Sequence, residues 1–199
     1  DACKIFGNSV DIKGGVNYFL IDKNYDGLCN YNGSNIQLNK YDIIVDSKNY
    51  DIIEKLSTYP NITDLYLGRC YGIESNDKKL TNDNKHLKCY VSQQKGFIKY
   101  IDKKEIKKEY NFYKVITTRA AFEANSGFGN TFIGSINEVH TGSYISFKVS
   151  NEKEAKSLVS YMKCKLPNFM LSLRKQSQDI NENTCKWIAL PSLDKEWTD

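Results

Sequence analysis

The chain has 199 residues, of which 40% are hydrophobic and 26% are charged, and its formal net charge is +4. This composition excludes an intrinsically disordered protein, the length is sufficient for a self-supporting core, and the apolar runs are too short to cross a bilayer. The positive balance favours an anionic partner only weakly, because Lys, Asn, Ile and Tyr, which AT-rich codons encode, are frequent along the whole chain.

The first third of the chain is expected to form short strands and one helix. Residues 15–22 alternate and lead to the turn signal Asp26-Gly27, which predicts a strand. Asn32-Gly33 predicts a tight turn between two strands, and 41–45 a short buried strand. Over 49–57 the apolar residues recur at helical spacing and a proline follows, which predicts an amphipathic helix.

The middle of the chain is expected to be rich in strands. The polar stretch 69–84 predicts a long exposed loop. Two strands over 87–91 and 96–101 predict a hairpin, and the lysine-rich segment 103–109 a helix or turn. Further strands are expected at 112–117, 131–136 and 143–149, with a glycine loop at 125–130.

The last third changes to a helical period. Ser150 precedes an acidic first turn and an apolar face, which predicts a capped helix, and a second helix follows Pro167 and ends at 174–176. The fold expected is α+β, a curved mixed β-sheet with a C-terminal helical hairpin. Four apolar side chains of the hairpin should pack against the sheet or each other: Leu158, Met162, Phe169 and Leu173.

The cysteines leave two interpretations open. The six residues are Cys3, Cys29, Cys70, Cys89, Cys164 and Cys185. Their irregular spacing without a C-x-x-C pair argues against structural zinc. Free, mostly buried thiols are favoured over a disulfide framework, which belongs mainly to small secreted domains. The start of the chain also lacks the features of a secretory signal, so a cytoplasmic location is expected.

Catalytic motifs are scarce. The Asn-Pro-Pro-Tyr motif of amino-methyltransferases does not occur, no Gly-x-Ser-x-Gly turn occurs, and both histidines, His86 and His140, are expected at the surface. Glu105-Ile106-Lys107, with Asp83 upstream, imitates one end of a magnesium-dependent nuclease site. The alternative for this charged run is a solvated helix face.

Several motifs follow one another along the chain. They are 10–20 with 22–27, Arg69-Cys70-Tyr71-Gly72-Ile73, Lys95-Gly96-Phe97-Ile98, Tyr113-Lys114-Val115-Ile116, and the ending 161–194. In this order they resemble the C-terminal specificity region of single-chain type II restriction-modification DNA methyltransferases and, more distantly, type I specificity subunits. The chain departs from that pattern at Cys70, where Pro is common, at Arg119, where Lys is common, and at Ala189-Leu190, which replaces Val-Pro.

The resemblance implies a single target-recognition domain over 1–199 that is a fragment of a longer bacterial methyltransferase. The chain opens at Asp1 without an initiator Met and stops in mid-pattern, which also suggests a fragment. The fragment would carry no catalytic residue, metal or cofactor. The parent would be an adenine-specific DNA methyltransferase that uses S-adenosylmethionine, with or without restriction endonuclease activity. The expected partners are double-stranded DNA and the methyltransferase domain of the same chain, with no membrane.

A DNA-reading module needs cations for phosphates and Arg, Asn or Gln for base edges. The candidates for DNA contact are Lys13, Arg69, Tyr71, Arg119, Asn125, Arg174, Lys175 and Gln176. Alternatives are surface ion pairs for Arg69 and Arg119, helix-C-terminal dipole partners or phosphate contacts for Arg174 and Lys175, and a packed ring for Tyr71. Lys13, Arg69 and Arg119 are expected on one face with Asn125. Two other classes stay open, namely a cryptic magnesium-dependent nuclease and a binding module without a nucleic-acid role.

Overall fold

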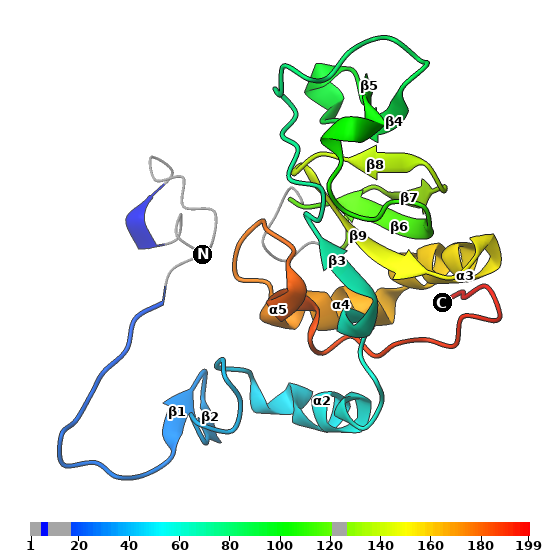
Figure 1. Cartoon of the computed structure of the whole chain (residues 1–199). Helices are drawn as coiled ribbons and strands as arrows, with labels where there is room; N and C mark the ends of the chain where they lie inside the picture. Colours follow the sequence, from blue (N-terminus) through cyan, green and yellow to red (C-terminus); the bar gives the residue numbers. More distant parts are fainter. Residues whose placement is uncertain (1–4, 8–16, 121–126) are drawn as a thin grey trace.

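The computed structural model describes residues 5–7, 17–120 and 127–199 (Figure 1). Its centre is a four-stranded antiparallel sheet with the strand order β3-β9-β6-β7. The strands are β3 (Tyr66–Gly68), β9 (Tyr144–Val149), β6 (Tyr113–Thr118) and β7 (Thr131–Gly134). A second sheet of three strands has the order β5-β4-β8, in which β4 pairs antiparallel with β5 and parallel with β8. These strands are β4 (Leu87–Tyr90), β5 (Ile98–Ile101) and β8 (Glu138–His140).

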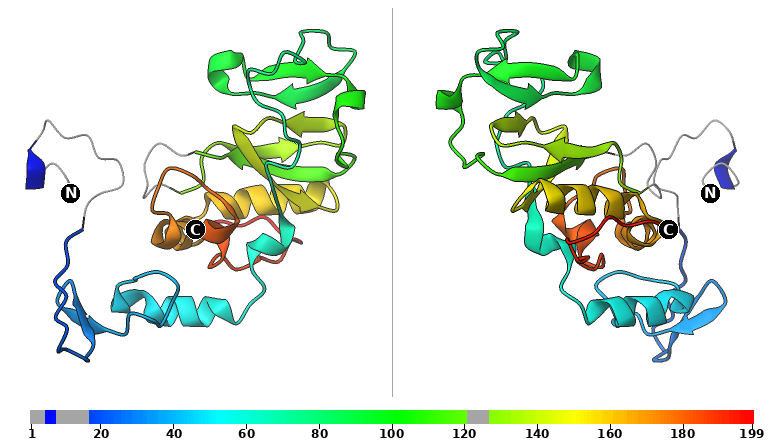
Figure 2. Two further views of the ribbon diagram at one scale, coloured as in Figure 1. Left: turned by 60° about the vertical axis from the view of Figure 1, so that its left-hand side comes forward. Right: turned by 90° about the vertical axis from the view of Figure 1, so that its right-hand side faces the viewer.

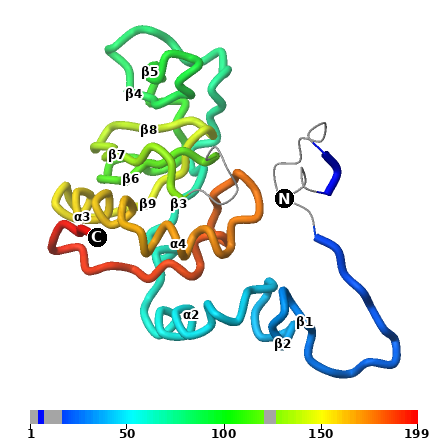
Figure 3. Tube along the Cα trace, turned by 180° about the vertical axis from the view of Figure 1, so that it is seen from behind, coloured from blue at the N-terminus to red at the C-terminus, as the bar shows by residue number. Residues whose placement is uncertain are grey.

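Three helices form a layer on the face of the central sheet that is remote from the three-stranded sheet. They are α3 (Glu152–Lys163), α4 (Lys165–Arg174) and the short α5 (Glu182–Cys185). The views in Figure 2 show the central sheet between this layer and the three-stranded sheet. At the far side of the helices lie the hairpin of β1 (Cys29–Tyr31) and β2 (Ser34–Ile36), and α2 (Tyr50–Ser57) (Figure 3).

The period of two along β6 explains this layering. Val115 is buried in the main core with the helices, whereas its neighbour Ile116 is buried with Tyr90 of the three-stranded sheet. On β9, Phe147 likewise joins the main core, and Tyr144 joins the Tyr90 cluster. Successive side chains of a strand point to opposite faces, so one apolar strand supplies both layers.

Elements with strong local signals form as the sequence predicts. The α+β class is confirmed. Asn32 and Gly33 both have positive φ, 51° and 85°, as a tight hairpin turn between β1 and β2 requires. The β4–β5 hairpin, the strands β6, β7 and β9, and helices α2, α3 and α4 also lie where they were expected.

Several expectations are wrong. The described part of 15–22 is an exposed, irregular segment, in which Leu20 is 95% exposed. The segment 41–45 bends and forms no strand, although Val45 is buried as expected. The loop 69–84 is irregular, but Tyr71 and Ile73 are buried in it. One curved sheet was expected, and the structure has two main sheets because the β4–β5 hairpin pairs with β8 instead of with the central strands.

The helical region needs smaller corrections. The N-cap of α3 is Asn151, whose Oδ1 accepts the Glu154 N–H at 2.9 Å, not Ser150. Leu158 and Met162 are buried and Leu173 packs against the core, whereas Phe169 is 41% exposed. Among the described residues, no helix combines the length and apolar character needed to span a bilayer.

Candidate nucleic-acid interface

Arg69 and Arg119 lie at the surface beside the turn at 142–143. The Arg69 guanidinium lies so close to Gly142 that a Cβ there would collide with it, and the Arg119 N–H donates to the Ser143 carbonyl at 2.9 Å. Arg69 pairs with Glu74, and Arg119 Nε is 3.9 Å from Asp179 Oδ1. Both arginines therefore make the surface ion pairs of the alternative interpretation, in a partly exposed setting where such pairs are weak and exchangeable.

The Ser75 hydroxyl connects this turn to the tip of the β4–β5 hairpin through hydrogen bonds. Ser75 Oγ lies 2.8 Å from Thr141 Oγ1 and 2.9 Å from Ser143 Oγ, and it accepts the Ser92 N–H at 3.1 Å. The next two residues of the tip, Gln93 and Gln94, are exposed. The structure thus brings two arginines and two glutamines, the residue types that read guanine and adenine, to one region.

Three other candidates are not at the surface. Tyr71 is 8% exposed and its ring packs edge-on against His140 with centroids 5.1 Å apart, so the packed alternative holds. Arg174 and Lys175 are 5% and 2% exposed, which corrects their expected contact with DNA. Gln176 is exposed. Lys13 and Asn125 lie outside the described residues, so the prediction that they share a face with Arg69 and Arg119 stays a prediction.

Arg174 has a structural partner far away in the sequence. Its guanidinium donates to both carboxylate oxygens of Asp42 at 2.7 and 2.6 Å, and to the Asn183 carbonyl at 2.8 Å. It also lies 4.5 Å from the centre of the Trp187 ring. This bonding holds the pKa of Asp42 below its usual value. The interaction clamps the segment after β2 to the helical layer.

A cluster of buried polar groups connects the two main sheets. Lys114 is fully buried, and its ammonium donates to the carbonyls of Tyr110, Ser135 and Glu138 at 3.1, 3.0 and 2.8 Å. Burial lowers its pKa to about 8. The Glu138 carboxylate accepts from Lys88 Nζ at 3.0 Å and from the Tyr90 hydroxyl at 2.9 Å. These bonds join β8 to β4 of its own sheet and to β6 of the central sheet, and they satisfy the buried groups.

His140 is also in this cluster, contrary to its expected surface position. It is 1% exposed, with Nδ1 3.0 Å from the Thr141 carbonyl and Nε2 2.9 Å from Ser146 Oγ. The carbonyl can only accept, so Nδ1 carries the proton and Nε2 accepts from Ser146. Burial lowers the pKa of His140 to about 4. Ser146 is fully buried as well, so this Ser–His pair stabilises the fold and does not face a substrate.

The nuclease-like residues have other partners. Glu105 pairs with Lys79 at 2.6 Å, Ile106 is buried, and Asp83 accepts the Lys85 N–H at 3.1 Å. Within the described ranges, no group of three or more His, Cys, Asp or Glu is placed to hold a metal ion. The five described cysteines are free, as expected, and Cys3 lies outside the described residues. Burial raises the pKa of the Cys89 and Cys185 thiols to about 12.

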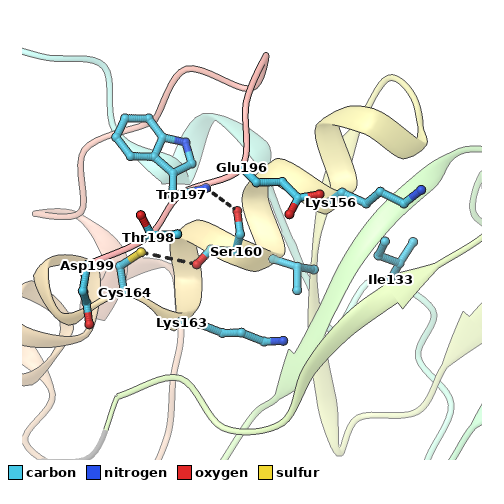
Figure 4. Close-up of a pocket in the computed structure, with 10 residues that line it drawn as sticks. Ile133, Lys156, Ser160, Lys163, Cys164, Glu196, Trp197, Thr198 and Asp199 are labelled. Carbon is cyan, nitrogen blue, oxygen red and sulfur yellow. Dashed lines mark hydrogen bonds between the residues drawn. The ribbon is translucent and has the colours of Figure 1, made fainter.

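The C-terminal segment leaves a hollow of about 500 Å³ against α3 (Figure 4). The apolar part of the lining comes from Ile133, Val159 and Trp197. The backbone N–H of Trp197 donates to Ser160 Oγ at 2.8 Å. Two of the four charged groups on its lining are already paired, Lys156 with Glu152 at 2.7 Å and Asp199 with Lys165 at 3.4 Å. The other two, Lys163 and Glu196, have opposite charges, so the lining has no net charge and favours neither an anionic nor a cationic ligand.

The strongest electrostatic feature is the segment 78–108, which we call the basic lobe. It contains β4 and β5 and lies on the side of the central sheet remote from the helices (Figure 2). It holds ten lysines against three acidic residues, a net charge of +7, whereas the whole chain has +4. Eight of the lysines make no ion pair with the described residues. One of them, Lys99, donates to Asn82 Oδ1 at 2.6 Å, and the other seven are Lys78, Lys85, Lys95, Lys103, Lys104, Lys107 and Lys108.

The basic lobe was missed by sequence reasoning that weighed the charge of the whole chain. A count within a window of about this length would have found it, since the remaining residues carry a net charge of −3. Comparison of the chain with protein-family models, with curated proteins and with solved structures gives no match.

Proposed function

We propose that the chain binds double-stranded DNA through the basic lobe and is the target-recognition domain of a longer restriction-modification methyltransferase. The observation that carries this proposal is the concentration of uncompensated lysines on one lobe. Cationic side chains release condensed counterions when they contact phosphates, and this release supplies much of the affinity of DNA-binding proteins. The motif order described above supports the choice of class.

The surface around the 142–143 turn would supply sequence preference. Gln93 and Gln94 are exposed at the tip of the β4–β5 hairpin, and Arg69 and Arg119 lie beside the turn to which the tip is bonded, so these four side chains would address base edges in a major groove. The ion pairs of both arginines are exposed, so their exchange for guanine or phosphate costs little. S-adenosylmethionine would bind to the methyltransferase domain of the longer chain.

The experiment is a binding titration of duplex DNA across a salt series, followed by fluorescence anisotropy. The lobe variant replaces Lys95, Lys107 and Lys108 with Gln. A control variant replaces Lys55, Lys153 and Lys186, three exposed lysines outside the lobe, so that the change in net charge is the same.

For the wild-type chain, log Kd should rise linearly with log salt, with a slope of about 0.9 per phosphate contact. Each lobe lysine that contacts a phosphate should reduce the slope by about one, and the control should leave it unchanged. Equal slopes for the two variants would refute the assignment to the lobe. Absence of duplex binding at low salt would refute the proposed function.

A further inference from the structure

Three segments of the basic lobe meet at one end of the three-stranded sheet. Leu87, the first residue of β4, pairs with Ile101, the last residue of β5, and Lys88 pairs with Glu138, the first residue of β8. The residues that precede β4, follow β5 and precede β8 therefore surround a common space. This space is a hollow of about 440 Å³, lined by Lys85, His86, Leu87, Asp102, Lys103, Lys104 and Asn137.

The carboxylates near this hollow are used to fix its backbone. Asp102 Oδ1 accepts the Lys104 N–H at 2.9 Å and caps a short turn of 3-10 helix, Lys103–Glu105. Asp83 Oδ1 accepts the Lys85 N–H at 3.1 Å on the opposite wall. Such side-chain caps hold local turns in place, so both lysine-bearing walls are shaped before any ligand arrives.

The ammonium groups of the hollow remain available. Lys85, Lys103 and Lys104 are exposed and make no ion pair with the described residues. Three lysines and one Asp give the lining a net charge of +2, and the Asn137 amide adds a hydrogen-bond donor. The His86 ring is already directed to a carboxylate, with Nε2 3.8 Å from Asp83 Oδ2. Asn137 is held at its place on the rim, because the neighbouring Glu138 carbonyl and carboxylate are bonded to Lys114 and Lys88. The hollow thus offers several positive donors on a fixed frame.

We infer that this hollow is a phosphate-binding site, which in the proposed function holds one phosphate group of the DNA backbone. An ammonium group binds phosphate as a point charge and a neutral amide adds direction, so this set of donors fits a phosphate oxygen cluster. The inference deepens the proposed function and rests on it for the source of the phosphate. The site fixes the position of the lobe on the duplex and carries no base preference.

The test uses the whole chain labelled with ¹⁵N, titrated in separate experiments with sodium pyrophosphate and with a short duplex. A pocket variant replaces Lys85, Lys103 and Lys104 with Gln, and the control again replaces Lys55, Lys153 and Lys186. Because all six side chains are exposed, both variants should keep the wild-type melting temperature. The single variant K103Q serves if the triple pocket variant melts earlier.

With pyrophosphate, the amide signals of Leu87, Lys104 and Asn137 should shift in the wild type and the control, and the shifts should be lost in the pocket variant. With the duplex, the pocket variant should lower the salt slope by about one phosphate contact. If the duplex binds and the pocket variant behaves as the control with both ligands, the phosphate site is wrong and the proposed function stands. If pyrophosphate shifts these signals and no duplex binds, the site stands and the proposed function fails.

Discussion

The clamp between Arg174 and Asp42 allows a structural role to be separated from a role in DNA binding. We predict that Arg174→Met destabilises the protein and leaves the DNA affinity of the folded protein unchanged. Methionine keeps much of the apolar stem that packs on Trp187, so the change removes mainly the guanidinium and its four hydrogen bonds to Asp42 and Asn183.

The size of the effect follows from the burial of the two partners. The Arg174 side chain is 2% exposed, whereas that of Asp42 is 55% exposed. Removing one partner of a buried ion pair costs about 3–5 kcal/mol, mostly because the other charge is left without compensation. Here the carboxylate that remains is accessible to water, so the expected loss is roughly 3 kcal/mol, at the lower end of that range.

Urea unfolding, followed by tryptophan fluorescence, measures this loss as a change in the free energy of unfolding. The matched control is Arg119→Met, because Arg119 is 37% exposed and its ion pair is 3.9 Å long, so its loss should cost less than about 1 kcal/mol. Equal unfolding free energies for the two variants would refute the structural role of Arg174. A loss of duplex affinity in Arg174→Met at temperatures where it is fully folded would restore its expected contact with DNA.

Three further outcomes follow from the buried groups. The pKa of His140 is about 4 in the folded protein and 6.5 in a free side chain, so between these pH values only the unfolded chain gains a proton at this residue. The free energy of unfolding should therefore fall by up to about 3 kcal/mol as the pH drops from 6.5 to 4. Acid unfolding curves of His140→Asn should lack this pH dependence. Lys114→Met leaves three buried carbonyls without their shared donor, so it should lower the unfolding free energy by about 3 kcal/mol, and an unchanged urea midpoint would contradict this. Among the five described cysteines, the half-buried Cys29 should react with a thiol reagent before the buried Cys89 and Cys185, as mass spectrometry of the native protein can show.

Elements whose stability is local could be predicted from the sequence. Asn32-Gly33 selects its turn by backbone conformation alone, and the apolar faces of α2 and α3 repeat within a few residues. The prediction of a strand at 15–22 was wrong for the opposite reason. The alternation of this segment is typical of a strand, but a strand forms only when it pairs with another strand. The described part of the segment has no such partner among the described residues, and a local pattern does not show this.

Features that depend on distant pairing could not be predicted. Strand β8 has three residues and pairs in parallel with β4, which lies about 50 positions earlier in the chain. The periodicity of the sequence does not predict such a pairing. The burial of His140 follows from that pairing, because β8 is the edge strand of the three-stranded sheet beside the central sheet, where the His140 ring meets Ser146 of β9. Arg174 looked like a helix-terminal cation, and its partner Asp42 is 132 positions away.

The layering separates the groups that stabilise this protein from the groups proposed to bind DNA. The main core lies between the central sheet and the helices, and the basic lobe lies on the opposite face of that sheet. Lys114 and Glu138 connect the two parts, since they join β6 of the central sheet to β8 of the three-stranded sheet. A lobe that is held by buried polar bonds keeps its lysines on a fixed frame, so less ordering entropy is lost on binding. Substitutions of the exposed lysines should therefore change DNA affinity without changing stability, and substitutions in the buried connection should change stability first.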